Sequence, residues 1–565
     1  MATADSFDVI VLGAGAGGMT AACVAASEGL DTVVLEKTRC IGGTTAISGG
    51  MVWAPNSAGD CDSTDSPAQA ETYLDETVPT DAGRDLRRAF LKAAPKAIAY
   101  MRRHTSVQLK PVPFYPDYYP AAAGSTTSGR VLEPVPFDGR ELGPAFNLLR
   151  PPLPEFTLFG GMMVARPDLP HFRNVFHSLR SARRVLRLMS AYFLQRIGHR
   201  RGVDLVLGNA LAGRFLKSLL DLSVPVRLGV EVLRIERDSE RITGVVIIED
   251  GVERFIGVRR GVILATGGFS HDRARRAALY PHQAQDVSMV PETATGDGLR
   301  LGEGAGGRVE EGQFGSGFWT PASRYVRADG RRVVFPHSVT DRGKPGLIAV
   351  NAEGRRFTNE AVSYHAFVKA MLRADNSGQT IPARLICDSR FIWKYGLGAI
   401  KPMTLRLQPF KAAGYLSEAR TIGDLAKRIG VDAQVLEATV ARHNQDARNG
   451  VDTAFGRGGD VYQRHYGDPE ICPNPCMAPI EKPPFYSVSV YPADLGTAAG
   501  LATNEHAQVL DDDGSPTPGL YACGADMRSI MQGAYPGPGV TIGPALVFGY
   551  LAAQHIAREG RTGTD

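Results

Sequence analysis

Three glycines and one glutamate near the start of the chain have the types and the spacing needed to bind a pyrophosphate-linked nucleotide. Gly13, Gly15 and Gly18 give the pattern G-x-G-x-x-G, and Glu36 ends the next apolar run. In such a loop the first glycine makes a tight turn, the second lets the backbone approach a pyrophosphate, and the third lets a helix pack closely on a strand. The Glu36 carboxylate can bind both hydroxyls of an adenine ribose and would repel a ribose phosphate. The pattern therefore predicts FAD or NAD and excludes NADP.

The elements around this loop must present it to the ligand. The apolar residues 9–12 predict a buried parallel strand, the alanine-rich residues 19–27 a helix, and residues 30–35 a second strand. The helix would point its free N–H groups and partial positive charge at the phosphates. Residues 302–307 repeat the glycine spacing, but no strand precedes them and no acid closes a second strand. We therefore reject them as a second nucleotide loop.

The composition of the 565-residue chain excludes several classes of protein. A hydrophobic content of 43% and a charged content of 22% are typical of globular proteins. A net charge of +4 argues against a nucleic-acid surface, and no apolar run is long enough to cross a membrane. There are seven cysteines, and Cys472 and Cys476 lack a second pair or a nearby histidine. This pattern favours a reduced, cytoplasmic protein with no metal site.

The order of the segments predicts an α/β protein in which a second domain interrupts a nucleotide-binding domain. Residues 232–248 alternate between apolar runs and charged turns, as in a small antiparallel insertion, and residues 261–268 form a strand that ends in small residues. The middle of the chain has more aromatics and mixed charge, with a helical stretch near residues 425–444. We predict a discontinuous nucleotide-binding domain, residues 1–310 and 488–565, and an inserted domain, residues 311–487.

Residues 170–204 combine many arginines with an apolar helical pattern. No acid lies between Asp168 and Asp204, whereas eight arginines do, and apolar residues recur at helical spacing from residue 185 to residue 197. A basic amphipathic helix of this kind can lie on an anionic membrane surface. We favour the plainer interpretation, a surface helix that covers the domain below it, and leave peripheral membrane contact open.

Four segments together resemble one family of flavoenzymes. They are residues 42–50 (GGTTAISGG), residues 115–120 (YPDYYP) followed by Gly129, Arg130 and residues 137–140 (FDGR), residues 356–364 (RFTNEAVSY), and residues 534–545 (AYPGPGVTIGPA). The chain resembles the flavin-dependent 3-ketosteroid Δ1-dehydrogenases, within the class of fumarate-reductase-like flavoproteins, from about residue 7 to residue 556. The resemblance implies FAD as cofactor. It also implies a Rossmann-like FAD-binding domain of the glutathione-reductase type with an inserted α+β catalytic domain.

The resemblance also implies a reaction and the residues that perform it. In that family a 3-ketosteroid lies over the flavin, loses a hydride from C1 and loses a proton from C2. Tyr535 and the N–H of Gly539 match the groups that polarise the C3 carbonyl, and Tyr364 matches the base. Tyr118 matches the phenol that assists the base, with the neighbouring Tyr119 as an alternative. Such assistance is needed because the ordinary pKa of tyrosine is about 10.

The glycine-rich segments and the resemblance together predict the residues that bind FAD. Residues 42–50 offer N–H groups and hydroxyls directly after the nucleotide acid, and the last helix would point its positive end at the flavin. Some relatives attach flavin through a histidine that residues 38–41 lack, so we expect non-covalent FAD. Asp526 is either a ribityl contact or a simple loop acid. The predicted contacts are Gly13, Ala14, Gly15, Ala16, Gly17, Gly18, Glu36, Lys37, Gly42, Gly43, Thr44, Thr45, Ser48, Gly49, Gly50, Val232, Ala265, Thr266, Gly267, Asp526, Gly543, Ala545 and Leu546.

Other functions stay open on this evidence. A dicarboxylate enzyme would need cationic clamps, which Arg324 and His365 leave room for, although residues 312–322 are aromatic and uncharged. A dehydrogenase acting at C4–C5 of a steroid, or on a non-steroid cyclic ketone, would share the fold. A flavoprotein sensor or electron carrier would not need the tyrosine-bearing loop at residues 534–539. No second nicotinamide fold is evident, so the expected electron acceptor is quinone-like or another carrier.

Overall fold

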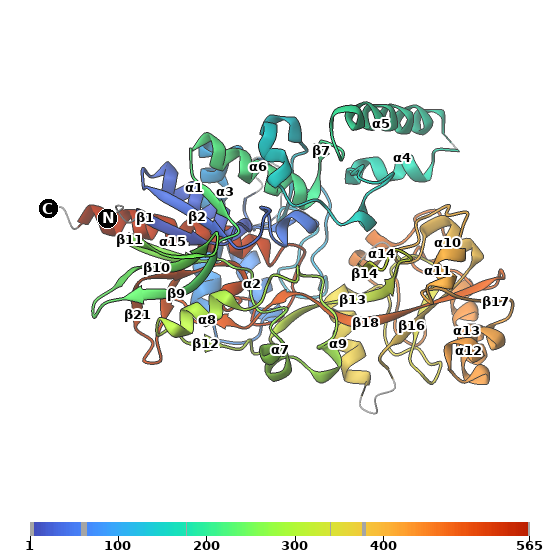
Figure 1. The fold of residues 1–565 in the computed structure, drawn as a ribbon. Coiled ribbons are helices and arrows are strands. Elements are labelled where there is room, and N and C mark those ends of the chain that lie inside the picture. The colour runs from blue at the N-terminus through green and yellow to red at the C-terminus, as the bar shows by residue number, and fades with distance from the viewer. Residues whose placement is uncertain (1–4, 58–64, 177, 339–340, 376–379, 563–565) are drawn as a thin grey trace.

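The structure is a computed structural model that describes residues 5–562, except residues 58–64, 177, 339–340 and 376–379. Figure 1 shows two bodies side by side, one formed by the two ends of the chain and one formed by its middle. The chain termini lie together at the far end of the first body (Figure 1). No helix among the described residues has the length and apolar content needed to cross a membrane.

An eight-stranded sheet forms the centre of the first body. Its main order is β20-β21-β11-β1-β2-β8, and β1 (Ser6–Leu12) runs parallel to both β2 (Thr32–Glu36) and β11 (Val252–Leu264). The apolar run at residues 9–12 is fully buried, as a central parallel strand requires. Helix α1 (Ala16–Ser27) follows β1 and packs on α15 (Ile542–Thr562). The other strands are β8 (Val226–Leu228), β9 (Glu231–Arg237), β10 (Ile242–Glu249), β20 (Gln508–Leu510) and β21 (Pro516–Ala522).

A six-stranded antiparallel sheet forms the centre of the second body. Its order is β14-β13-β18-β16-β15, with β17 also paired to β18. The bounds are β13 (Gly317–Val326), β14 (Arg332–Pro336), β15 (Leu347–Val350), β16 (Ala383–Asp388), β17 (Ser417–Ala419) and β18 (Phe485–Thr497). The helices are α9 (Tyr364–Ala374), α10 (Ser389–Tyr395), α11 (Gln408–Ala412), α12 (Ile422–Ile429), α13 (Ala433–Asn449) and α14 (Val461–Tyr466). The prediction of an α/β nucleotide fold with an α+β second unit is confirmed.

Two details differ from the sequence-based expectations. The helical stretch near residues 425–444 is two helices, because Gly430 adopts φ +73° and ends α12 before Asp432 caps α13. The predicted return to the first domain at residue 488 falls inside β18, which pairs with β13 and β16 along its length. We therefore propose that the inserted domain extends to about Thr497.

Shorter elements cover the first sheet and connect the bodies. A small sheet has the order β3-β5-β4, with β3 (Val52–Trp53), β4 (Leu109–Pro111) and β5 (Val131–Pro134). The rejected glycine repeat at residues 302–307 begins within the last turn of α8 (Asp297–Gly304), and no strand leads into it. Figure 1 shows α4 (Leu169–Arg173) and α5 (Leu179–Gly198) set apart above the second body. The remaining elements are β6 (Phe137–Asp138), β7 (Asp204–Leu205), β12 (Val309–Glu310), β19 (Gly500–Leu501), α2 (Pro67–Thr77), α3 (Arg84–His104), α6 (Leu207–Asp221) and α7 (Arg273–Leu279).

Candidate active site

A cavity of about 1310 Å³ runs from the N-terminal glycine loop to a cluster of tyrosines. Both bodies line it, since its walls include β1–α1 residues and residues of α9 and of β13. The predicted cofactor residues that line it are Gly13, Ala14, Gly15, Ala16, Gly17, Glu36, Lys37, Gly43, Thr44, Thr45, Ser48, Gly49, Gly50, Val232, Ala265, Thr266, Gly267 and Ala545. Tyr118, Tyr364, Tyr535 and Gly539 line the same space. The structure thus brings predicted cofactor contacts and predicted catalytic residues to one cavity.

The nucleotide end of the cavity is built as the sequence pattern requires. Each carboxylate oxygen of Glu36 accepts one backbone N–H, from Ala14 and from Thr38, both at 2.9 Å. A carboxylate has about four acceptor positions, so two remain for ribose hydroxyls. The hydroxyl of Thr45 accepts the N–H of Ala16 at 3.1 Å and ties the second glycine-rich turn to the start of α1.

The open space at several glycines fits a bound FAD. A Cβ placed on Gly15, Gly49 or Gly267 would meet no protein atom within 4 Å, so each glycine faces free volume in the cavity wall. The N-termini of α1 and α15 both reach this wall and would offer partial positive charge to the phosphates and the flavin of a bound FAD. Lys37 adds a cation, held by Asp297 at 2.6 Å.

Five predicted cofactor residues do not line the cavity, namely Gly18, Gly42, Asp526, Gly543 and Leu546. Gly18 and Gly543 serve close packing, because an added Cβ would lie 2.0 Å from the carbonyl oxygens of Gly13 and Trp53, respectively. Asp526 is fully buried and accepts the N–H groups of Thr266 and Gly268. It therefore holds the 266–268 turn, as a loop acid would, while that turn faces the cavity.

Three phenol rings meet at the other end of the cavity. The Tyr118 hydroxyl donates to the Tyr364 hydroxyl at 3.1 Å. Tyr364 and Tyr535 lie with ring centroids 5.3 Å apart, and Tyr118 and Tyr535 with centroids 5.9 Å apart. Tyr119, the alternative to Tyr118, does not line the cavity. Residues separated by hundreds of positions in the chain therefore form one hydroxyl cluster.

Each tyrosine is carried by a different kind of segment. Tyr118 lies in the excursion between β4 and β5, and Tyr535 lies in the proline- and glycine-rich loop before α15. Tyr364 is the first residue of α9, whose N-terminus Ser363 caps by accepting the N–H of Ala366 at 3.2 Å. A helix N-terminus carries partial positive charge, which favours a phenolate at Tyr364.

Burial shifts the acidity of all three phenols. Desolvation raises the pKa of Tyr118 and of Tyr364 well above the ordinary value, and it raises the pKa of Tyr535 to about 12. The hydrogen bond from Tyr118 acts in the opposite direction on Tyr364 and lowers its pKa. Hydrogen bonds from Tyr364 and Thr541 lower the pKa of Tyr535, but burial outweighs them and keeps Tyr535 protonated near neutral pH, while the Tyr118 hydroxyl donates to Tyr364 and stabilises its anion.

Gly539 has the backbone geometry of a close-contact amide. Its φ of +88° is in the region that favours glycine, and an added Cβ would lie 2.5 Å from the Met51 carbonyl oxygen. Its carbonyl oxygen accepts the N–H of Trp53 at 3.2 Å and the N–H of Gly543 at 2.8 Å. These bonds hold the peptide at the cavity wall.

Beyond the tyrosines the cavity is mainly apolar. Its walls there include Phe156, Phe159, Leu169, Phe172, Phe335 and Met403. Neither possible carboxylate clamp lines it: Arg324 is exposed on β13 over the Tyr491 ring, and His365 is buried. The His365 Nδ1 accepts the N–H of Trp319 at 3.2 Å, and burial lowers its pKa to about 3, so His365 is neutral. This end of the cavity suits a flat, apolar ligand.

Sequence reasoning missed several residues of the cavity wall. Asp297 pairs with Lys37, Phe318 packs edge-on against Tyr535 with centroids 5.4 Å apart, and Tyr115 bonds the Tyr466 hydroxyl at 2.5 Å. Arg150 also lines the cavity, beside the second glycine-rich turn. Asp297 and Arg150 belong to no recognisable motif, whereas Tyr115 and Phe318 lie inside aromatic segments of the sequence.

This fold and site define an FAD-dependent flavoprotein. The model of the FAD binding domain family matches residues 8–542. The chain is 36% identical to a 3-oxosteroid 1-dehydrogenase of Mycobacterium tuberculosis, over 98% of this chain and 99% of the relative. It is 39% identical to a 4-oxocyclohex-2-ene-1-carboxylate 5-dehydrogenase of Sinomonas cyclohexanicum, over 98% of this chain and 94% of the relative.

Solved structures agree with these relatives. A 3-ketosteroid Δ1-dehydrogenase of Sterolibacterium denitrificans, solved in complex with 1,4-androstadiene-3,17-dione, superposes with a TM-score of 0.92 at 36% identity. The alignment covers 98% of this chain and 100% of that one. The chain therefore belongs to the family of FAD-dependent flavoproteins that includes the 3-ketosteroid Δ1-dehydrogenases, and its cofactor is FAD.

Proposed function

We propose that the protein is a 3-oxosteroid 1-dehydrogenase, which removes two hydrogens from C1 and C2 of a 3-ketosteroid. The observation that carries the proposal is the hydroxyl cluster of Tyr118, Tyr364 and Tyr535 with the Gly539 amide at the apolar end of an FAD-sized cavity. A saturated C–H bond is inert unless a neighbouring carbonyl acidifies it, and this cluster supplies both a carbonyl clamp and a base.

The clamp acts on the C3 oxygen. The Tyr535 hydroxyl and the Gly539 N–H would both donate to that oxygen and stabilise the negative charge that develops there as C2 loses its proton. Tyr535 is suited to this role because its raised pKa, about 12, keeps it protonated. One such donor contributes about 10²- to 10³-fold to a rate.

The base acts on C2. The Tyr364 oxygen would take the proton, assisted by the hydroxyl of Tyr118 at 3.1 Å and by the N-terminus of α9. FAD, when bound, supplies the acceptor for the hydride that leaves C1. The substrate loses one proton and one hydride, and a C1=C2 double bond remains.

The direct test uses androst-4-ene-3,17-dione and an artificial dye as electron acceptor. The expected result is dye reduction together with formation of the cross-conjugated 1,4-diene-3-one. A dicarboxylate enzyme would instead leave the steroid unchanged and oxidise reduced dye with a dicarboxylate. A C4–C5 dehydrogenase would act on the ring-saturated 3-ketosteroid without forming a C1=C2 bond.

A second candidate substrate class is a cyclohexenone carboxylate. The 39% identity to the Sinomonas cyclohexanicum relative favours it, and Arg173 and Lys401 at the apolar end of the cavity are cations near which a carboxylate can bind. The large apolar wall favours the steroid. Turnover with 4-oxocyclohex-2-ene-1-carboxylate, compared at equal concentration with androst-4-ene-3,17-dione, decides between them, and we expect kcat/KM to favour the steroid.

Removing the assisting phenol should move the pH dependence of the reaction. The hydrogen bond from Tyr118 lowers the pKa of Tyr364, so Tyr118→Phe should raise that pKa. A base works only when deprotonated, so the rising limb of kcat against pH should shift to higher pH, with a loss of about tenfold near neutrality. Steady-state kcat measured from about pH 6 to about pH 10 checks this. An unshifted profile would show that Tyr118 does not assist the base.

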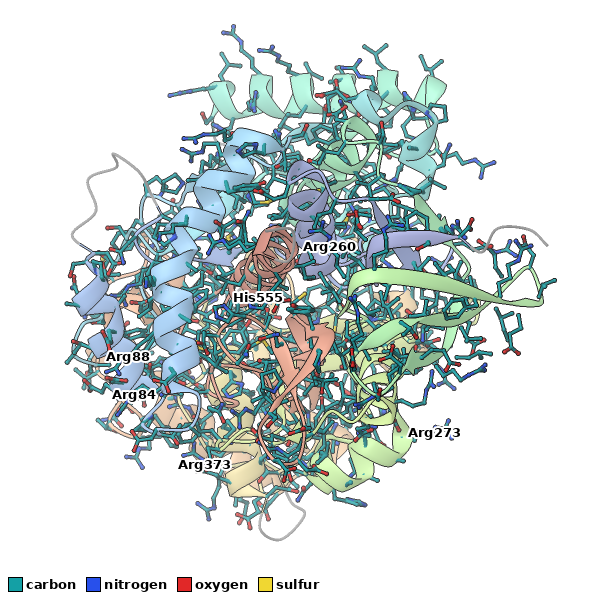
Figure 2. All side chains as sticks on the ribbon, turned by 90° about the vertical axis from the view of Figure 1, so that its left-hand side faces the viewer. Arg84, Arg88, Arg260, Arg273, Arg373 and His555 are labelled. Atoms are coloured by element: carbon teal, nitrogen blue, oxygen red, sulfur yellow. The ribbon has the colours of Figure 1, made fainter. Side chains whose placement is uncertain are left out.

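The basic helix α5 supports peripheral membrane contact, which would suit a lipophilic substrate. Figure 2 shows α5 along the top edge, with side chains extending away from the body. Leu186 is 66% and Ile197 85% exposed on it, and Arg183 and Arg187 stand exposed nearby. The segment that precedes α5 in the sequence lines the cavity with Phe159, Leu169 and Phe172. We propose that α5 docks on an anionic bilayer near the substrate entrance. A lipid-soluble quinone would then be an accessible electron acceptor.

Vesicle sedimentation tests the docking surface. Binding to phosphatidylcholine vesicles should rise when phosphatidylglycerol is added, and Arg183→Glu with Arg187→Glu should weaken it at least about tenfold. The matched control is Arg88→Glu with Arg273→Glu, two surface arginines that Figure 2 places well below α5. If both double variants lose vesicle binding equally, or if the wild type does not bind, the membrane-docking proposal is wrong. Helix α5 is then a surface helix that covers the domain below it.

A further inference from the structure

A buried ion pair between Asp117, directly before Tyr118, and Arg130 lies in the β4–β5 excursion and outside the cavity wall. Arg130 and Asp117 are each 1% exposed, and the Arg130 Nη1 and Asp117 Oδ2 atoms lie 2.7 Å apart. Arg130 also pairs with Asp65 at 2.7 Å, bonds the Gly124 carbonyl at 2.7 Å and stacks over the Tyr73 ring at 5.0 Å. Neither Arg130 nor Asp117 lines the cavity. The pair therefore cannot act on a ligand directly.

One arm of this network reaches the assisting phenol. Asp117 directly precedes Tyr118, and its carboxylate accepts the N–H of Thr126 at 3.1 Å as well as the Arg130 guanidinium. The Asp117 N–H in turn donates to the Thr126 carbonyl at 3.0 Å. These bonds join the two sides of the segment between β4 and β5. They therefore fix the backbone from which the Tyr118 side chain extends.

The other arm reaches the loop of the carbonyl clamp. The Tyr73 hydroxyl, beneath Arg130, donates to the Pro536 carbonyl at 2.6 Å, and the Tyr118 N–H donates to the same oxygen at 3.1 Å. The Trp53 indole N–H lies 3.4 Å from the Asp117 carboxylate, and the Trp53 backbone N–H donates to the Gly539 carbonyl at 3.2 Å. One buried network thus touches both loops.

We propose that Asp117 and Arg130 are positioning residues that hold the base-assisting Tyr118 and the Tyr535–Gly539 loop in register. The inference rests on the proposed function. The Asp117–Arg130 pair would then contribute to the rate of that reaction as well as to the stability of the fold. A displacement of reacting groups by about 1 Å can cost about 100-fold in rate. A buried, hydrogen-bonded ion pair is a rigid support for such geometry, because breaking it leaves an uncompensated charge.

The test uses two conservative variants in the FAD-loaded enzyme. Asp117→Asn keeps the size and part of the hydrogen bonding, and Arg130→Lys keeps the charge but loses the planar fork. We expect kcat to fall about 10- to 100-fold, with KM for androst-4-ene-3,17-dione changed less than about threefold. The limb of kcat against pH should move to higher pH in Asp117→Asn, in the same direction as in Tyr118→Phe.

A double-mutant cycle separates positioning from mere stability. If Asp117 acts through Tyr118, Asp117→Asn should shift the pH limb no further in the Tyr118→Phe background. The matched control is Arg276→Lys, at a buried arginine that pairs with Asp494 at 2.7 Å and lies outside the cavity wall. It should lower the thermal midpoint but leave the pH limb in place.

The outcomes distinguish the two proposals. A wild-type enzyme that ignores the steroid overturns the proposed function. A wild-type enzyme that turns over, with Asp117→Asn unchanged in kcat and in pH limb, overturns the positioning role alone. Equal, additive shifts in the cycle would also overturn it, because they would show that Asp117 does not act through Tyr118.

Discussion

Tyr364→Phe should lower kcat about 10³-fold while the protein still binds FAD and substrate. The substitution removes the oxygen that is proposed to take the C2 proton, and general-base catalysis contributes about 10²- to 10⁴-fold. The ring stays and continues to fill its place against Tyr118 and Tyr535, at centroid distances of 5.6 and 5.3 Å. The lost hydrogen bond from Tyr118 should cost only about 1 kcal/mol of stability. Rapid mixing with androst-4-ene-3,17-dione, followed by the oxidised-flavin absorbance, measures the rate.

The matched control is Tyr280→Phe. Tyr280 is also a buried tyrosine, and it does not line the cavity. Tyr280→Phe removes one hydroxyl oxygen and should leave kcat within about twofold. The substitution lies away from the site, so it should change the stability of the protein and not its turnover. A Tyr364→Phe enzyme with full activity would remove Tyr364 from the role of base.

The nucleotide half of the site was predictable because its parts are neighbours in sequence. Gly13, Gly15 and Glu36 belong to one strand–helix–strand unit, in which local spacing determines which atoms face the ligand. The same local logic explains the split helix, since Gly430 followed by Asp432 is a helix stop followed by a helix start. These features need no knowledge of how distant segments pack.

The tyrosine half was not predictable from spacing. Tyr118 and Tyr535 come from loops of the first body and Tyr364 comes from the start of α9 in the second, so only the packing of the two bodies brings them to one cavity. The resemblance supplied their identities, and the geometry supplied the choice of Tyr118 over Tyr119 at the Tyr364 hydroxyl. The roles themselves remain predictions.

The polar support behind the cluster illustrates a further limit. Arg130 belongs to one of the four segments that carry the family resemblance, but nothing in the sequence predicts that it pairs with Asp117 or that the Tyr73 hydroxyl donates to the Pro536 carbonyl. Asp526 posed the opposite problem, because two interpretations fitted its place after a strand. Its bonds to the 266–268 turn place it behind the cavity wall, where its carboxylate shapes the backbone that faces the cavity.

Tyr535→Phe should lower kcat about 10²- to 10³-fold, because it removes one of two donors to the developing charge on the C3 oxygen. The Gly539 N–H remains, so the activity should stay above that of Tyr364→Phe. The ring keeps its contacts with Phe318 and with His365, whose centroid lies 5.6 Å away, so FAD content should be unchanged.

A ligand-binding measurement separates the clamp from the base. A steroid with an aromatic, phenolic A ring imitates the enolate, since it places a hydroxyl oxygen where the C3 oxygen would lie. Its affinity should fall about tenfold in Tyr535→Phe, where a donor to that oxygen is lost, and should change little in Tyr364→Phe. The control Tyr521→Phe removes a buried hydroxyl bonded to His555 and outside the cavity wall, and should change neither rate nor affinity. Equal affinity losses in Tyr535→Phe and Tyr364→Phe would mean that the two phenols do not divide the work as proposed.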